Sequence, residues 1–233
     1  ISGWYSLMKP VNIAIDGPSG VGKSTIAKSL AARLGFTYID TGAMFRTLAV
    51  YFLRKGVDSG DEAAVCALLP ECDVDIRYED GQQHMYLNGE DVTGLIRTEE
   101  VSKVASVTSQ YGEVRRKLLY MQQDMARRQD VIMDGRDIGT VVLPDAQLKL
   151  FVTARPEVRA RRRYLQLKEQ GRLGDATLED ILKDMEERDY RDSHRENAPL
   201  MEAEDAVLLD NSDISEAEAE DRILELLRER KLI

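Results

Sequence analysis

Residues 17–24 carry the pattern Gly-x-x-x-x-Gly-Lys-Ser, which few local structures can accommodate. An apolar run over 11–16 precedes it, and an amphipathic segment over 24–34 follows it. A strand, a glycine-rich turn and a helix in this order predict a phosphate-binding loop. The glycines let successive backbone N–H groups approach an anion, and the N-terminus of the helix adds partial positive charge. The alternative is a glycine-rich turn that binds no ligand.

Three polar side chains suit a nucleotide and its metal ion. Lys23 can reach the β- and γ-phosphates of a nucleotide, and the Ser24 hydroxyl can ligate Mg²⁺. A second apolar run over 131–133 ends in Asp134, whose carboxylate can hold Mg²⁺ or its water shell. Alternatively, Asp134 only caps the end of a strand.

Five short apolar runs predict the buried strands of one sheet, at 11–16, 36–40, 130–134, 148–153 and 206–210. Helical patterns separate most of them, over 24–34, 113–129 and 156–170, and a last helix begins at the capping box Ser215-x-x-Glu218. Strands that alternate with helices predict an α/β fold with a parallel sheet covered on both faces.

The segment 73–87 interrupts this alternation. Two short β-rich runs, 73–78 and 84–87, are joined through Asp80-Gly81, and Asn88-Gly89 follows at once. Such turn dipeptides predict an antiparallel excursion inserted into the α/β body. A second irregular stretch, 171–176, separates two charged helices and is expected to act as a hinged cover.

Charge and hydropathy exclude several classes of protein. The 233 residues contain no run near the ~18 apolar residues of a membrane-spanning helix. A formal net charge of −10 argues against general binding of nucleic acid or anionic membranes. The chain nevertheless has 22 Arg against 10 Lys, and arginines gather in 155–163 and 188–195. Because arginine grips phosphate or carboxylate in a fixed geometry, we expect a small anionic ligand.

The two arginine clusters allow different interpretations. Three consecutive arginines at 161–163 cannot share one helix face, so some of them must be solvated. Arg188 and Arg195 are seven residues apart and are predicted to lie on one helix face, with Asp192 one turn after Arg188. That face either presents cations and an acceptor to a ligand or carries a weak surface ion pair, and spacing alone does not decide between them.

Cysteine and histidine usage points to neither a disulfide framework nor a metal cage. Cys66 and Cys72 are the only cysteines, and His84 and His194 stand alone. The first residues lack the features of a signal peptide. We expect a natural start at Met8, with residues 1–7 as an extension, one domain over 9–233, a cytoplasmic location and a monomer.

Four motifs together resemble bacterial cytidylate kinases, a family of P-loop nucleoside monophosphate kinases. They are the loop Ile15-Asp-Gly-Pro-Ser-Gly-Val-Gly-Lys-Ser-Thr25, Asp40-Thr-Gly-Ala-Met-Phe-Arg46, Asp134-Gly-Arg-Asp-Ile-Gly-Thr140 and Glu187-Arg-Asp-x-Arg-Asp-x-x-Arg195. The resemblance implies the P-loop kinase fold with a five-stranded parallel sheet of order 2-3-1-4-5. It also implies an inserted monophosphate-binding domain over about 41–110, which accounts for the antiparallel excursion, and a short lid over about 155–176. Ser24 and Thr41 stand where some members have Gly and Ser.

The resemblance further implies transfer of the γ-phosphoryl group of ATP to CMP or dCMP, in pyrimidine nucleotide metabolism, with Mg²⁺ as cofactor. The residues implied to bind ATP are Gly17, Pro18, Ser19, Gly20, Val21, Gly22, Lys23, Ser24, Thr25 and Arg162. Ser24 and Asp134 would hold the metal, directly or through water. Lys23, Arg136 and Arg188 would be catalytic.

For the acceptor, the resemblance implies three groups of contacts. Arg46 and Arg136 would bind the CMP phosphate. The base would be lined by Thr41, Arg115, Asp137 and Arg195. Ser106, Arg188 and Asp192 would touch the sugar. Two alternatives remain open: another small-molecule P-loop kinase, such as one acting on shikimate or a different nucleotide, and a P-loop switch without an acceptor. The antiparallel insertion disfavours the first alternative, and the lack of an Asn/Thr-Lys-x-Asp segment disfavours a GTPase-like switch.

Overall fold

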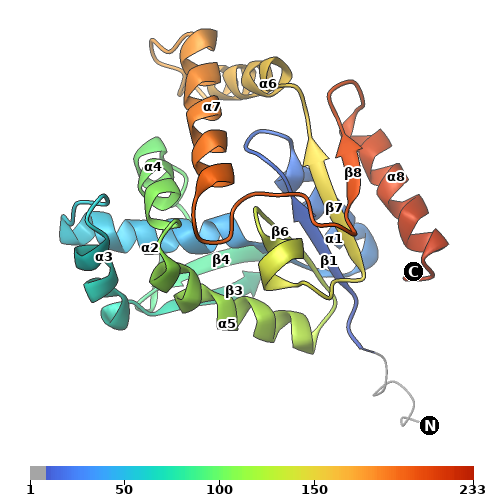
Figure 1. The fold of residues 1–233 in the computed structure, drawn as a ribbon, viewed down its shortest axis with the longest axis horizontal. Coiled ribbons are helices and arrows are strands. Elements are labelled where there is room, and N and C mark those ends of the chain that lie inside the picture. The colour runs from blue at the N-terminus through green and yellow to red at the C-terminus, as the bar shows by residue number, and fades with distance from the viewer. Residues whose placement is uncertain (1–8) are drawn as a thin grey trace.

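A computed structural model of the chain describes residues 9–233. Its centre is a five-stranded parallel sheet in the order β2-β6-β1-β7-β8 (Figure 1). The strands are β1 (Asn12–Asp16), β2 (Thr37–Asp40), β6 (Val131–Gly135), β7 (Leu148–Thr153) and β8 (Val207–Asp210). Each predicted apolar run is therefore a strand, and the expected order 2-3-1-4-5 is confirmed. The expected start at Met8 lies outside the described residues.

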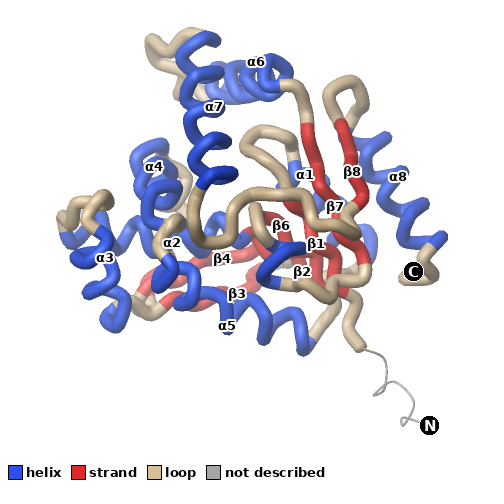
Figure 2. Tube along the Cα trace, viewed as in Figure 1, coloured by secondary structure: helices blue, strands red, loops and turns tan. Residues whose placement is uncertain are grey.

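Both faces of the sheet are buried, because side chains alternate along each strand. From β1, Ile13 and Ile15 point into one apolar cluster and Ala14 into another. The helices α1 (Lys23–Leu34) and α8 (Glu216–Glu229) supply the first cluster. The helices α2 (Thr41–Lys55) and α5 (Gly112–Arg128) supply the second. Figure 2 shows the strands enclosed between these helices, and the capping box at Ser215 that begins α8 is present as predicted.

The insertion lies on the side of α2 and α5 (Figure 1). After α2 come α3 (Glu62–Leu68), the short helix η1 (Leu69–Glu71) and a three-stranded antiparallel sheet, followed by α4 (Glu99–Thr108). Its strands are β3 (Val74–Glu79), β4 (Gln82–Leu87) and β5 (Glu90–Asp91). Asp80 and Gly81 both have positive φ, as a tight hairpin turn requires, so the predicted antiparallel excursion is confirmed.

A helical hairpin rises above the sheet and the insertion. It consists of α6 (Pro156–Glu169) and α7 (Leu178–His194), and the predicted irregular stretch joins the two helices (Figure 1). A small separate apolar cluster holds the hairpin together, formed by Ala160, Leu167, Ile181 and Met185. The C-terminal half of α7 lies between the phosphate-binding loop and the insertion (Figure 1). Within residues 9–233, no helix has the length and apolar character needed to cross a lipid bilayer.

Candidate active site

The phosphate-binding loop connects β1 to α1 at the carboxyl edge of the sheet. Gly17 has φ +151°, and a Cβ there would lie 2.0 Å from the carbonyl oxygen of Val152 on β7, so only glycine fits. Gly22, the residue just before α1, has a left-handed backbone conformation, and no side chain caps the start of the helix. Its first backbone N–H groups are therefore free to bind an anion.

Lys23 is buried at the base of this loop, with 7% of its surface exposed. Its Nζ donates a hydrogen bond to the carbonyl oxygen of Pro18 at 2.7 Å. Burial, and next the positive charge of Arg136, hold the pKa of Lys23 well below its usual value. An ammonium group crowded by another cation gains most from an anionic ligand.

Asp134 and Ser24 bring two oxygen ligands together beside the loop. Ser24 Oγ donates to Asp134 Oδ2 at 2.7 Å, and the Tyr38 hydroxyl donates to Asp134 Oδ1 at 3.2 Å. Burial, together with the nearby charge of Asp40, raises the pKa of Asp134 to about 6. A hydroxyl and a carboxylate with excess negative charge nearby fit Mg²⁺, which is held by one or two carboxylates and substrate phosphates and needs no all-protein cage.

Three arginines surround the space in front of Lys23. Arg136 Nε donates to Asp192 Oδ2 at 2.8 Å, and Arg46 Nη2 donates to Asp40 Oδ2 at 3.0 Å. Among residues 9–233, the buried Nε atoms of Arg46 and Arg188 have no hydrogen-bond partner. Burial, followed by the charge of Arg136, lowers the pKa of Arg188 to about 10. Buried cationic donors without partners are costly, and an anionic ligand would satisfy them.

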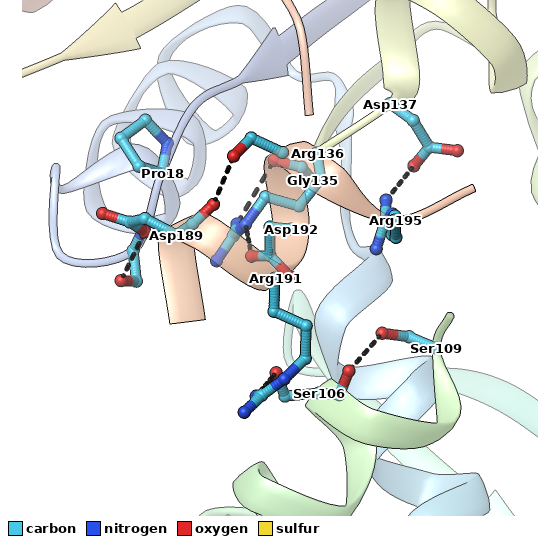
Figure 3. Close-up of polar contacts among 12 residues, drawn as sticks. Pro18, Ser106, Ser109, Gly135, Arg136, Asp137, Asp189, Arg191, Asp192 and Arg195 are labelled. Atoms are coloured by element: carbon cyan, nitrogen blue, oxygen red, sulfur yellow. Dashed lines mark hydrogen bonds and ion pairs between the residues drawn. The ribbon is translucent and has the colours of Figure 1, made fainter. Parts of the chain in front are cut away.

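Asp137 lies between two guanidinium groups at the far end of this space. Arg115 Nη2 donates to Asp137 Oδ2. On the other side, Arg195 Nη2 lies 3.9 Å from Asp137 Oδ1, and Figure 3 shows these two side chains facing each other. Thr41 begins α2 beside them, and its Oγ1 donates to the carbonyl oxygen of Asp134 at 2.7 Å. The three charged groups form a polar wall in which a carboxylate oxygen and donor nitrogens are available to a ligand.

Ser106 joins the site from the insertion. Its side chain is 5% exposed on α4, and its Oγ accepts a hydrogen bond from Arg191 Nη1 on α7 at 2.8 Å (Figure 3). Asp192, one residue further along α7, reaches Arg136 instead. Burial would raise the pKa of Asp192, but Arg136 and Arg188 hold it below its usual value.

Arg162 on α6 is linked to the phosphate-binding loop through Asn211, which follows β8. Arg162 donates to Asn211 Oδ1 at 3.1 Å and to the Asn211 carbonyl oxygen at 2.8 Å, and Asn211 Nδ2 donates to the carbonyl oxygen of Val21. Ser19 donates hydrogen bonds to the Asp189 carboxylate on α7. Thr25 is exposed in the first turn of α1.

The prediction that Arg188 and Arg195 share one helix face is wrong. Helix α7 ends at His194, and Arg195 has extended backbone angles of φ −67° and ψ 146°. The Arg195 Nε donates to the carbonyl oxygen of Ala198 at 2.8 Å, which turns this side chain toward Asp137 and away from the line of the helix. Arg188 and Asp192 do lie one turn apart on α7, as predicted.

Pattern reasoning missed four residues that shape the site. Asp16 accepts hydrogen bonds from the backbone N–H groups of Ile138 and Gly139 at 2.8 and 2.7 Å. The other three are Asp189, Arg191 and Asn211. Asp16 is the last residue of β1 and Asn211 directly follows β8, and this position at the carboxyl end of a strand could have marked them. Asp189 and Arg191 lie within the motif 187–195, which marked them without giving them a role, because only the packing of α7 shows what they contact.

The parallel sheet, the phosphate-binding loop and the buried guanidinium groups in front of it define the class of P-loop kinases. The model of the cytidylate kinase family matches residues 13–229. The chain therefore belongs to the cytidylate kinase family.

Individual relatives agree with this assignment. The chain is 48% identical over 219 residues to a cytidylate kinase of Caldicellulosiruptor bescii, a match that covers 94% of this chain and 96% of that protein. It is 45% identical over 221 residues to a cytidylate kinase of Lactobacillus johnsonii, with 95% of both chains covered. The solved structure of an uncharacterised protein from Eubacterium ventriosum aligns with a TM-score of 0.53 at 13% identity, covering 95% of this chain and 99% of that one, which shows a shared fold.

Proposed function

We propose that this protein transfers the γ-phosphoryl group of ATP to CMP or dCMP, which yields ADP and CDP or dCDP. The observation that carries the proposal is a phosphate-binding loop without a side-chain cap, opposite buried guanidinium donors that have no hydrogen-bond partner in the described part of the chain. One anion is expected at the loop and a second at the arginines. The match to cytidylate kinases along nearly the whole chain supports CMP as the second anion.

On the donor side, the loop 17–25 would hold the phosphates of ATP, with Lys23 on the β- and γ-phosphates. Arg162, tied to the loop through Asn211, would approach the same nucleotide. Ser24 and Asp134 would hold Mg²⁺, directly or through water. When bound, Mg²⁺ supplies positive charge that neutralises the phosphate oxygens.

On the acceptor side, Arg46 and Arg136 would bind the CMP phosphate. Thr41, Arg115, Asp137 and Arg195 would line the base, and Ser106, Arg188 and Asp192 would contact the sugar. We assign residues 41–110 as the insertion that binds the acceptor and 155–176 as the lid. The polar wall of Asp137, Arg115 and Arg195 suits a base that offers both a donor and acceptors.

The transfer itself needs no strong general base, because the attacking phosphate oxygen is already anionic near neutral pH. The protein must align two polyanions that repel each other and neutralise the charge on the moving group. Burial, and next the nearby charge of Arg136, lowers the pKa of both Lys23 and Arg188, so these groups are crowded with positive charge that an anion would balance. The lid would exclude water, which would otherwise hydrolyse ATP.

An acceptor panel tests the proposal. ADP release from MgATP is measured with CMP, dCMP, UMP, AMP, shikimate and no acceptor. We expect the highest kcat/KM with CMP or dCMP. Preference for shikimate or another nucleotide would identify a different small-molecule kinase, and ATP binding without acceptor-dependent turnover would identify a nucleotide switch.

A further inference from the structure

Helix α7 contacts three parts of the site within little more than one turn. Asp189 reaches Ser19 in the phosphate-binding loop, Arg191 reaches Ser106 in the insertion, and Asp192 reaches Arg136 after β6. Arg188 lies next to Asp189, and its buried Nε has no partner among the described residues. Figure 3 shows Asp189, Arg191 and Asp192 pointing from α7 in these different directions.

The Asp189 carboxylate is held by the loop and by α6 together. Its Oδ1 accepts hydrogen bonds from the backbone N of Ser19 at 3.2 Å and from Ser19 Oγ at 3.1 Å. Its Oδ2 accepts a hydrogen bond from Arg159 Nη1 at 2.5 Å. Arg159 is 5% exposed and also donates to the carbonyl oxygens of Ser19 at 3.0 Å and Ala154 at 3.0 Å. Hydrogen bonds between charged groups are stronger than those between neutral groups, so these contacts hold Asp189 firmly against the loop.

Packing around the same contact is tight. A Cβ at Gly20 would lie 2.6 Å from the Cε atom of Met185, one turn before Asp189 on α7. The tip of the phosphate-binding loop therefore rests directly on α7.

We propose that Asp189 is a positioning residue that ties the phosphate-binding loop to Arg188, so that occupation of the loop by ATP sets Arg188 for the acceptor. The inference rests on the proposed function, because it takes CMP as the acceptor. Arg188 directly precedes Asp189 on α7, so the contact of Asp189 with Ser19 constrains where the helix places Arg188. Binding energies at two sites that share such an element are coupled, and the coupling is reciprocal.

The other possibility is that Asp189 only stabilises the hairpin through Arg159. In that case a variant at Asp189 would be less stable and would bind both ligands more weakly. The affinity for CMP would still change by the same factor when the ATP site is filled. The coupling factor separates the two roles. It is the Kd of CMP for the protein alone divided by the Kd of CMP in the presence of a saturating non-hydrolysable ATP analogue with Mg²⁺.

The test measures this factor by titration calorimetry for the wild type, Asp189→Asn and Ser19→Ala. Ser19→Ala removes the Oγ donor from the loop side without changing the charge of α7, so it also serves if Asp189→Asn does not fold. The matched control is Asp184→Asn, which makes the same change of charge at an exposed position of α7. We expect a wild-type factor of at least about threefold, corresponding to roughly 0.7 kcal/mol, a factor near one in Asp189→Asn, an intermediate value in Ser19→Ala and the wild-type value in Asp184→Asn.

Two results would overturn the inference. One is a wild type without coupling, and the other is an Asp189→Asn or Ser19→Ala protein that keeps the full wild-type factor. Failure of the proposed function is a separate result, because it would show as a wild type without CMP-dependent release of ADP.

Discussion

The guanidinium of Arg115 and the carboxylate of Asp137 form a buried ion pair, with Nη2 donating to Oδ2 at 2.5 Å. Arg115 is held in turn by the carbonyl oxygen of Ser109, to which its Nη1 donates at 3.0 Å. Only Oδ2 of Asp137 is used in this pair, and Oδ1 faces Arg195 without a hydrogen bond. One oxygen of a fixed carboxylate is therefore available to a donor on the ligand.

This arrangement predicts how CMP is distinguished from UMP. Cytosine offers an exocyclic amine as donor, whereas uracil offers a carbonyl oxygen that a carboxylate repels. Replacing the carboxylate by an amide, which can turn either face to the base, should lower kcat/KM for CMP more than for UMP. We expect Asp137→Asn to shrink the CMP-to-UMP ratio by roughly tenfold, or about 1.4 kcal/mol. Steady-state kinetics with both acceptors measure it.

The control is Asp145→Asn, the same change at an exposed residue a few positions later. An equal loss for both acceptors in Asp137→Asn would mean that Asp137 only orients Arg115 or the adjoining turn, and base discrimination would have to reside elsewhere.

Removal of the loop lysine should abolish transfer without unfolding the protein. Within residues 9–233, the Lys23 side chain makes one hydrogen bond, to the Pro18 carbonyl oxygen, and burial together with Arg136 disfavours its charge. We expect Lys23→Ala to lower kcat by several orders of magnitude, because stabilisation of the moving phosphoryl group is lost. The melting temperature should stay within a few degrees of the wild type. Lys103→Ala, an exposed position on α4, is the control, and more than about a tenth of the activity in Lys23→Ala would refute the assigned mechanism.

The buried Asp16 predicts a pH dependence of stability. Burial raises its pKa to about 6, although the hydrogen bonds from Gly139 and Ile138 pull it down. The unfolded value is about 3.9, so the folded state binds more protons between about pH 4 and pH 6. The contribution of Asp16 to the free energy of unfolding is therefore fully present below about pH 4 and is lost as the pH rises to about 6.

Urea unfolding of the wild type and Asp16→Asn between pH 4 and pH 8 measures this contribution, because the other carboxylates titrate alike in both proteins. We expect the free energy of unfolding of the wild type minus that of the variant to fall by on the order of 2–3 kcal/mol across this window and then to level off. A difference that rises with pH would contradict the raised pKa.

The hairpin of α6 and α7 should respond to ligands. Beyond its small apolar cluster and the buried contacts of Arg159 and Asp189 with the loop, it is tied to the insertion by the Arg163–Glu99 ion pair and by a hydrogen bond from Arg172 to the carbonyl oxygen of Arg97 at 2.9 Å. These two contacts with the insertion are partly or fully solvated and are individually weak. Amides of 155–176 should exchange faster than those of β1 and β6 in the free protein, and a non-hydrolysable ATP analogue with CMP should slow them. Unchanged exchange would argue against a lid.

Several features of the fold were predictable because they depend on local patterns. Each strand of the parallel sheet is a short apolar run. The pair Asp80-Gly81 predicts the hairpin of β3 and β4, because few other residue pairs tolerate positive φ at both positions. Helical spacing failed at Arg195. Counting seven residues from Arg188 assumes a helix that continues, but the Arg195 side chain bonds to Ala198 and the helix ends at His194.

The amino-acid sequence alone determined the strand–loop–helix of residues 11–34, the alternation of strands and helices, and the family, because these depend on residue type and spacing along the chain. Tertiary structure decided which charges meet. The hydrogen bonds of Asp189 with Ser19, Arg191 with Ser106 and Asp16 with Gly139 join residues that are 170, 85 and 123 positions apart. No periodicity in the chain encodes such pairs, since they form only when packed elements remove both partners from water and each must find the other.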